Sequence, residues 1–193
     1  MQKIKYSVII ALLFSMSLYA SEDIFDESRV WDVQIVGDDF IFYRVPGQAV
    51  WGHRYGFVKQ SPNCSQDQFF VEWSSYEDIK PYEGKYVPFS LVNDQGVSTK
   101  LNPTLIAVKD FTNIMQVGFF AEDDRGYSYS SAFKDFNKNS KQVTLSIGDD
   151  FDNFDIKTDT FLTSGYEKAR MNAEKTCRGL ASNDQILTAE LMR

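Results

Sequence analysis

His53 is the only histidine of the 193-residue chain, and it lies in the hexapeptide Trp51-Gly-His-Arg-Tyr-Gly. A Ser-His-Asp or Cys-His mechanism would have to use this ring as its base. The sequence contains neither the GxSxG pattern of a hydrolase nucleophile nor the HExxH pattern of a zinc protease. One histidine also falls short of the usual zinc ligand set. We therefore interpret His53 as a surface-loop histidine and predict a non-catalytic protein without metal or cofactor.

The hexapeptide as a whole has the composition of a binding loop. Tryptophan, tyrosine and arginine are the residue types enriched at binding hot spots, and glycines allow a loop to present them outward. We predict that Trp51, His53, Arg54 and Tyr55 contact a protein partner or a sugar. In the alternative interpretation, the aromatic side chains Trp51, Tyr55 and Phe57 pack into the rim of the core, as aromatic residues of β-proteins commonly do.

The two cysteines, Cys64 and Cys177, are predicted to form a disulfide. An even pair in an exported protein is typical of such a bond, and this one would close a loop of more than one hundred residues. The alternative makes Cys64 a catalytic thiolate, but the surrounding sequence offers no activating group.

Four aspartates crowd one expected strand connection, at positions 149, 150, 152 and 155. Calcium is bound by several oxygen ligands held close together, so this segment is a candidate calcium loop. The spacing departs from that of an EF-hand because Phe154 and Asp155 stand where an acidic ligand and a glycine belong. We favour solvated turn carboxylates and leave the calcium site as the alternative.

Apolar and polar residues alternate along most of the chain after Trp31, which is the period of a half-buried β-strand. Turns at 37–39 and 110–113 predict hairpins, and Pro88 places its segment at a sheet edge or bulge. We predict a mainly β fold, an antiparallel β-sandwich or open barrel, with a C-terminal α-helix packed on it. The expected strands are 31–35, 40–45, 69–73, 87–91, 104–109, 114–122, 143–147 and 154–162.

The period changes to that of a helix at residues 164–180. Ser164 and Glu167 have the spacing of a capping box, and Gly179 offers a left-handed helix end. One apolar stripe contains Tyr166, Ala169, Ala173, Cys177 and Leu180. Cys177 should therefore face the β-domain, where a bond to Cys64 would hold helix and sheets together. Residues 182–193 are expected to form a short second helix or a frayed tail.

The N-terminus has the pattern of a bacterial signal peptide over residues 1–20: two lysines, an apolar segment, and Ala20 before the cut. We predict one exported domain over residues 21–193, in the periplasm or secreted, with no stable membrane insertion after cleavage. The formal charge of -7 becomes about -9 once Lys3 and Lys5 are removed. Such acidity disfavours nucleic-acid binding. It keeps an exported protein soluble or steers it toward a basic partner.

The C-terminal region resembles that of a known bacterial family. The run Asp159-Thr-Phe-Leu-Thr-Ser-Gly-Tyr-Glu-Lys-Ala is followed by Ala173 and Cys177, and Trp31-Asp-Val and the strand 143–147 fit the same layout. This order resembles the invasion-associated locus B type of small periplasmic proteins. The resemblance implies a β-sandwich with a terminal helix and no catalytic residues.

These observations favour a non-catalytic protein-interaction module of the bacterial envelope. A sharper form of the hypothesis is an inhibitor or immunity protein that binds a basic toxin or cell-wall hydrolase. The alternative is a protein that binds or hydrolyses envelope glycans through the Trp51–Tyr55 loop and His53. A calcium-dependent adhesin-like module is a third hypothesis.

Overall fold

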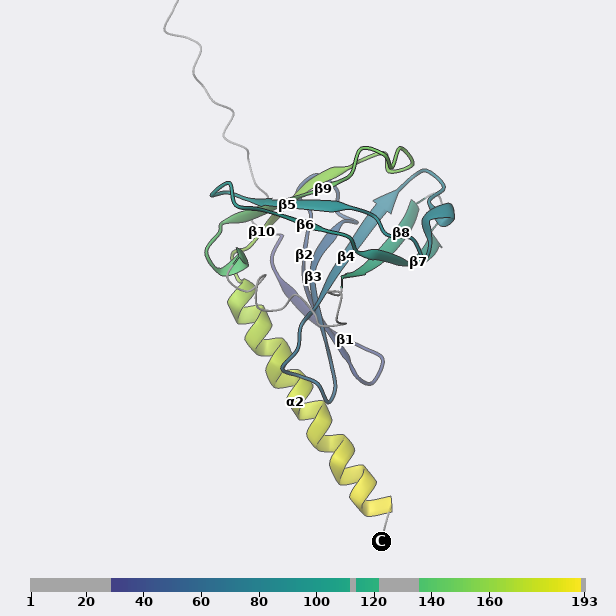
Figure 1. Cartoon of the computed structure of the whole chain (residues 1–193). Helices are drawn as coiled ribbons and strands as arrows, with labels where there is room; N and C mark the ends of the chain where they lie inside the picture. Colours follow the sequence, from purple (N-terminus) through teal and green to yellow (C-terminus); the bar gives the residue numbers. More distant parts are fainter. Residues whose placement is uncertain (1–28, 112–113, 122–135, 192–193) are drawn as a thin grey trace, which may run out of the picture.

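A computed structural model of the chain describes residues 29–111, 114–121 and 136–191. The predicted signal peptide, and Glu122 at the end of one expected strand, lie outside these residues. The described part forms ten β-strands in two antiparallel sheets, followed by one long helix, α2 (Figure 1). This confirms the predicted mainly β fold with a C-terminal helix.

The larger sheet has six strands in the order β1-β2-β3-β4-β8-β7. Their bounds are β1 Asp32–Val36, β2 Phe40–Pro46, β3 Arg54–Gln60, β4 Gln68–Ser75, β7 Thr104–Phe111 and β8 Ile114–Ala121. The β1–β2 hairpin turns at Gly37, whose φ of 64° suits glycine. The predicted pairing of β7 with β8 is also present, with Phe111 opposite Ile114.

The smaller sheet has four strands in the order β10-β9-β5-β6. Their bounds are β5 Phe89–Asn93, β6 Ser98–Leu101, β9 Gln142–Ile147 and β10 Thr158–Leu162. Pro88 does not place β5 at an edge as predicted, because it precedes the first paired residue, Phe89, and interrupts no ladder bond. The last strand is also shorter than expected and begins at Thr158.

The two sheets pack against each other through aromatic side chains that alternate along the strands. Trp73 of β4 lies 6.3 Å from Phe89 of β5 and 6.4 Å from Phe161 of β10, measured between ring centroids. All three side chains are buried, with at most 1% of their surface exposed. Aromatic rings bury more apolar area than other side chains, so this contact is a main source of sandwich stability.

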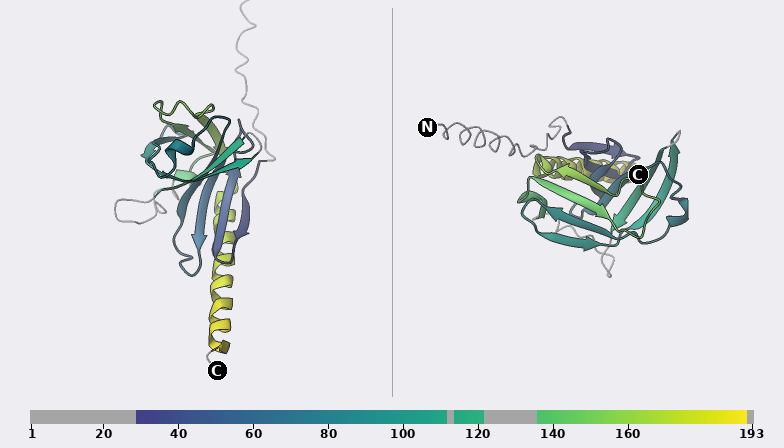
Figure 2. Two further views of the ribbon diagram at one scale, coloured as in Figure 1. Left: turned by 90° about the vertical axis from the view of Figure 1, so that its right-hand side faces the viewer. Right: turned by 90° about the horizontal axis from the view of Figure 1, so that it is seen from above.

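Helix α2, Tyr166–Leu191, covers the part of the larger sheet formed by β1, β2 and β3 (Figure 2). Four members of the predicted stripe are buried: Tyr166, Ala169, Ala173 and Cys177. The helix starts two residues later than predicted, after Gly165 with φ of 91°. The capping-box prediction is not met, since the Glu167 carboxylate bonds Arg170 instead of reaching back.

The predicted end of the helix near Leu180 is wrong. The helix continues through Gly179 to Leu191, and Figure 1 shows it extending well past the sheets. Gly179 is not among the glycines with positive φ, so it does not terminate the helix.

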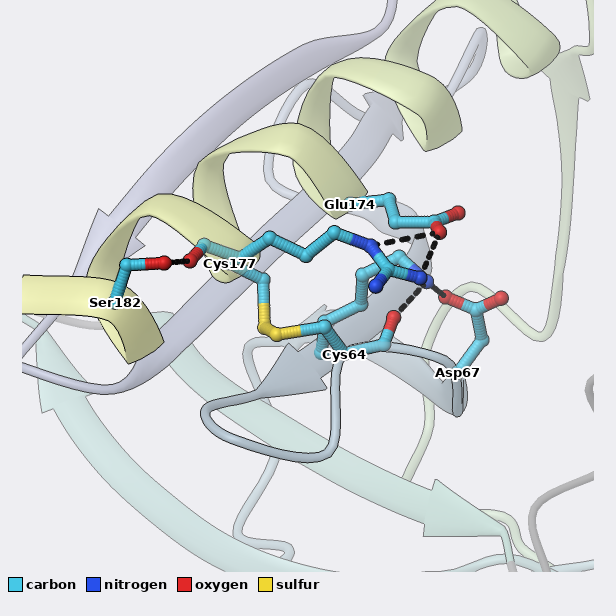
Figure 3. The surroundings of a disulfide bond; sticks show 7 residues. Cys64, Asp67, Glu174, Cys177 and Ser182 are labelled. Atoms are coloured by element: carbon cyan, nitrogen blue, oxygen red, sulfur yellow. Dashed lines mark hydrogen bonds and ion pairs between the residues drawn. A yellow bond between two sulfur atoms is a disulfide. The ribbon is translucent and has the colours of Figure 1, made fainter. Parts of the chain in front are cut away.

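The disulfide between Cys64 and Cys177 confirms the predicted pairing (Figure 3). It joins the β3–β4 connection to the middle of α2, across 113 residues of sequence. Lys59 lies beside it and is 1% exposed. The Lys59 ammonium donates to the Cys64 carbonyl at 3.0 Å and lies 2.5 Å from Asp67. The predicted disulfide between helix and sheets is therefore accompanied by a buried ion pair that was not predicted.

Candidate functional site

The turn between β2 and β3 is held by one buried carboxylate. Asp159 of β10 accepts hydrogen bonds from the backbone N–H groups of Ala49 at 2.8 Å and Val50 at 3.0 Å, and from its own neighbour Thr160 at 2.7 Å. Its side chain has no exposed surface. A buried carboxylate requires such charge-assisted partners, and three backbone donors with His53 provide them. Asp159 thereby fixes the turn of one sheet to a strand of the other.

His53 also contacts Asp159, and we call Asp159, His53 and the turn residues Ala49 and Val50 the clamp. His53 is fully buried. Its Nδ1 lies 2.9 Å from the Asp159 carboxylate and its Nε2 lies 3.1 Å from the Ser74 carbonyl oxygen. Both partner atoms are oxygen acceptors, a carboxylate oxygen and a carbonyl oxygen, which pair with N–H groups of a ring. The ring also stacks on Trp73, with centroids 3.8 Å apart. The surface-loop interpretation of His53 is therefore wrong. The ring lies in the core, where both of its nitrogens have partners, and neither nitrogen is open to a substrate.

Backbone bonds and two glycines close the turn tightly. Gly47 N–H donates to the His53 carbonyl at 2.8 Å, and His53 N–H donates to the Val50 carbonyl at 3.0 Å. A Cβ atom on Gly47 would lie 2.2 Å from the Asp159 carboxylate, and one on Gly52 would lie 2.2 Å from the Ser74 hydroxyl. Only glycine allows these close approaches.

The clamped turn presents one large side chain to solvent. Trp51 is 58% exposed, although its neighbours in the turn are tied to buried groups. The guanidinium of Arg29 lies over its ring, 5.2 Å from the centroid, and donates to the Gly47 carbonyl. A cation over the tryptophan face restrains the ring further. Trp51 is thus an exposed aromatic side chain on a rigid support.

The other predicted binding residues do not join Trp51 on this surface. Tyr55 is fully buried and its hydroxyl donates to Asn137 at 2.9 Å, which corrects its predicted outward position. Strand alternation places Arg54 on the opposite face of β3, where its guanidinium lies 3.4 Å from Glu72. The core-rim interpretation therefore holds for Tyr55 and Phe57 but not for Trp51.

A second loop meets the turn at the same end of the molecule. Gly52 lies against Ser74, near the end of β4. The hydroxyl of Ser75, the residue after Ser74, donates to the Asn153 carbonyl and to the Asp155 carboxylate, both at 2.8 Å. Asp155 also accepts the Tyr76 N–H at 3.3 Å. We call residues 47–53, 74–78 and 148–157 together the Trp51 surface; they lie near the top of Figure 1, beyond the arrowhead of β4.

The Trp51 surface combines exposed apolar groups with negative charge. Besides Trp51, it exposes Tyr76 to 70% and Ile156 to 37%. Six exposed carboxylates belong to it, against two cations, Lys157 and the Arg29 guanidinium that lies over the Trp51 ring. These carboxylates are Glu77, Asp78, Asp149, Asp150, Asp152 and Asp155. The surface therefore offers aromatic contact area inside a negative field.

Two aspartate side chains of the 148–157 loop, Asp152 and Asp155, have defined structural partners. Lys157 donates to the Asp152 carboxylate at 3.0 Å and to the Asp149 carbonyl at 2.8 Å, while Asp155 is bonded by Ser75. Within the described residues, no group of three or more His, Cys, Asp or Glu side chains is arranged to hold a metal ion. The calcium site remains the alternative interpretation of this loop.

Comparisons with known proteins do not assign the chain to a class. No family model matches the sequence, and no curated protein or solved structure is similar to it. The resemblance to the invasion-associated locus B proteins therefore stays a prediction. Within the described part of the chain, no helix is long and apolar enough to cross a membrane.

Proposed function

We propose that this protein is an exported, non-catalytic binding module that holds a basic protein of the bacterial envelope against the Trp51 surface. The observation that carries the proposal is the position of Trp51, 58% exposed on a turn that a buried carboxylate fixes through two backbone amides. An aromatic anchor that is already ordered loses little conformational entropy when it binds.

The charge of the surface supports a basic partner. Opposite charges on two proteins accelerate association and exclude partners of the same sign. Six carboxylates beside Trp51 and Tyr76 suit lysine- and arginine-rich proteins such as a toxin or a cell-wall hydrolase. In this form the protein acts as an inhibitor or immunity-type binder. The disulfide and the predicted signal peptide support its place in the periplasm or outside the cell.

Affinity capture from envelope extract tests the proposal, with the oxidised mature domain as bait. We expect one basic protein in stoichiometric amount, released by added salt. Trp51→Ala should reduce its capture at least tenfold, because truncating a central hot-spot residue removes 2 kcal/mol or more of binding energy, on the order of values at other interfaces. Met171→Ala is the matched control, since Met171 is 62% exposed but lies on helix α2.

A second pair of variants separates a local charge effect from net charge. Asp150→Asn lies on the Trp51 surface, whereas Asp38→Asn lies in the β1–β2 turn, and both residues are exposed. The first should slow association more than the second at low salt. Equal capture by wild type and Trp51→Ala, or a partner that is acidic and insensitive to salt, would reject the proposal.

The glycan-binding alternative retains only Trp51 from its predicted residues. An exposed indole can stack on a sugar ring, but His53 and Tyr55 are buried. A glycan array with wild type and Trp51→Ala tests it: retention of an envelope glycan that Trp51→Ala abolishes would favour this function over protein binding.

A further inference from the structure

A cleft beside the Trp51 surface has the chemistry of a ligand site. It has a volume of about 610 Å³ and lies where residues 29–30 cross the start of β9 and the end of β10. Clefts that bind small molecules have volumes of roughly 300–1,000 Å³. Its lining consists of Arg29, Val30, Ser140, Lys141, Gln142, Leu162 and Ser164. Trp51 does not line it, but Arg29 does, and the Arg29 guanidinium lies over the Trp51 ring, so the cleft adjoins the Trp51 surface.

The charge of this lining is opposite to that of the whole chain. The protein has 27 acidic and 20 basic residues, yet among the residues that the structure describes two cations and no carboxylate line the cleft. Lys141 is exposed at its edge. Asp94 bonds the backbone N–H of Lys141 at 3.0 Å and does not line the cleft. Two cations in the lining of this cleft favour an anion there, although the net charge of the protein is -7.

The other residues that line the cleft indicate the chemistry of the part of the ligand that lies beyond its anionic group. Val30 and Leu162 provide apolar surface, and Val30 is 61% exposed. The Ser140 hydroxyl already donates to the Phe136 carbonyl at 2.9 Å, so it offers a ligand only its acceptor side. Positive charge beside apolar surface suits a molecule with an anionic head and an apolar body.

We propose that this cleft binds a small amphiphilic anion, an alkyl carboxylate or alkyl phosphate, with Lys141 and Arg29 at its head group and Val30 and Leu162 against its chain. The head-group chemistry is shared by free amphiphiles and by phospholipids. The proposal does not rest on the protein-binding function: Lys141, Val30 and Leu162 belong to the cleft alone, and Arg29, which also lies over Trp51, is the residue the two sites share.

Titration calorimetry with the mature, oxidised protein tests the site. The probes are decanoate and decyl phosphate below their micelle concentrations, with decanol and decylamine as comparators of the same length. We expect saturable binding of both anions and at least tenfold weaker binding of decanol and decylamine. Octanoate should bind more weakly than decanoate, by up to about fourfold for each methylene that becomes buried.

Variants locate the site. Lys141→Gln should weaken decanoate binding about fivefold, because it removes a charged hydrogen-bond donor at an exposed edge. Lys175→Gln is the matched control, an exposed lysine on α2 that does not line the cleft. In two-dimensional NMR spectra, decanoate should shift the amides of residues 140–142 and 162–164. Absence of saturable binding, equal binding of decanol, unchanged affinity in Lys141→Gln, or shifts confined elsewhere would each overturn the proposal.

Sedimentation with phosphatidylglycerol vesicles distinguishes the two sources of ligand. If the vesicles retain wild-type protein but not Lys141→Gln, the site recognises a lipid head group. If they retain neither while decyl phosphate binds, the ligand is a free amphiphile. Both results support the site, and calorimetry alone decides whether the site exists.

Discussion

His53 and Asp159 lie 106 residues apart in the sequence and form a buried contact of 2.9 Å between Nδ1 and Oδ2. This contact links the β2–β3 turn of one sheet to β10 of the other. The same carboxylate accepts from the backbone N–H groups of Ala49 and Val50, directly before Trp51, so the orientation of Trp51 depends on an interior carboxylate. The exposed side chain that carries the proposed function is therefore held by residues that no partner can touch.

Asp159→Asn should destabilise the fold strongly. The amide replaces one acceptor oxygen by an N–H₂ group and leaves His53 and two backbone donors with fewer partners. Each buried donor left without its acceptor costs about 1–3 kcal/mol, which urea denaturation would measure as a lower midpoint. Asp152→Asn is the control, because that carboxylate is 93% exposed, and its effect should stay within about 0.5 kcal/mol. Equal midpoints for the two variants would show that Asp159 is not an anchor.

The strands with one buried face could be predicted because their side chains alternate. β9 alternates half-buried and buried residues from Gln142 to Ile147, and the helix stripe with Cys177 was equally regular. Strand β3 was missed because it has no such alternation: five consecutive residues from Tyr55 to Lys59 are buried, including a glycine and a lysine. Alternation in a sequence identifies strands that have one exposed face, and residues 55–59 of β3 have no exposed face.

The clamp could not be predicted for a different reason. A sequence with 27 acidic residues gives no indication of which carboxylate reaches His53 from 106 positions away. The hexapeptide correctly drew attention to Trp51, yet its residue types could not show that Tyr55 points inward and Trp51 outward. Tyr76 joins the surface only because Ser75 and Asp155 bring two loops together, and neither residue belongs to a local motif.

Gly47→Ala should weaken both the clamp and partner binding. Its new Cβ would lie 2.2 Å from the Asp159 carboxylate, which four hydrogen bonds hold in place. We expect a loss of about 2–3 kcal/mol of stability, in the range of overpacked sites. Gly179→Ala is the matched control, because nothing lies within 4 Å of its Cβ position in α2, and it should gain about 0.5–1 kcal/mol. Thermal melts of the two variants should therefore move in opposite directions.

Removal of the disulfide should lower stability more than any single surface change. Cys64 and Cys177 are 113 residues apart, and cross-linking a loop of that size stabilises by roughly 4–5 kcal/mol in the chain-entropy treatment. The double variant Cys64→Ala/Cys177→Ala should thus unfold at lower urea concentration than the oxidised wild type. Added reductant should lower the wild-type midpoint and leave the variant unchanged. A variant as stable as wild type would mean that the buried stripe alone holds α2 on the sheet.

The buried ion pair beside the disulfide should be more costly to break than to remove. Lys59 is 1% exposed and lies 2.5 Å from Asp67. Lys59→Met alone leaves a buried carboxylate without its cation and should cost about 3–5 kcal/mol. The double variant Lys59→Met/Asp67→Asn should recover part of that loss, giving a coupling energy of at least about 1 kcal/mol in a double-mutant cycle. Additive losses would show that the two charges do not interact.

Stability should fall above pH 10 because of three buried tyrosines. Burial raises the pKa of Tyr55 above its ordinary value of 10.0, as it does for Tyr43 and Tyr166. In the unfolded chain these phenols ionise near pH 10, whereas in the fold they stay neutral. Their contribution is therefore fully present below pH 10 and is lost as the pH rises further, by at most about 1.4 kcal/mol per pH unit for each phenol.

Tyr55→Phe tests this dependence directly. The variant loses the bond from the Tyr55 hydroxyl to Asn137, so it should be less stable than wild type at pH 7. Above pH 10 it has one fewer phenol to ionise on unfolding, and its stability should decline less steeply by about 1.4 kcal/mol per pH unit. Urea midpoints measured from pH 8 to pH 11, with tyrosinate absorbance recorded in parallel, give both quantities. Parallel curves for the two proteins would contradict the prediction, because they would mean that Tyr55 ionises equally in both states.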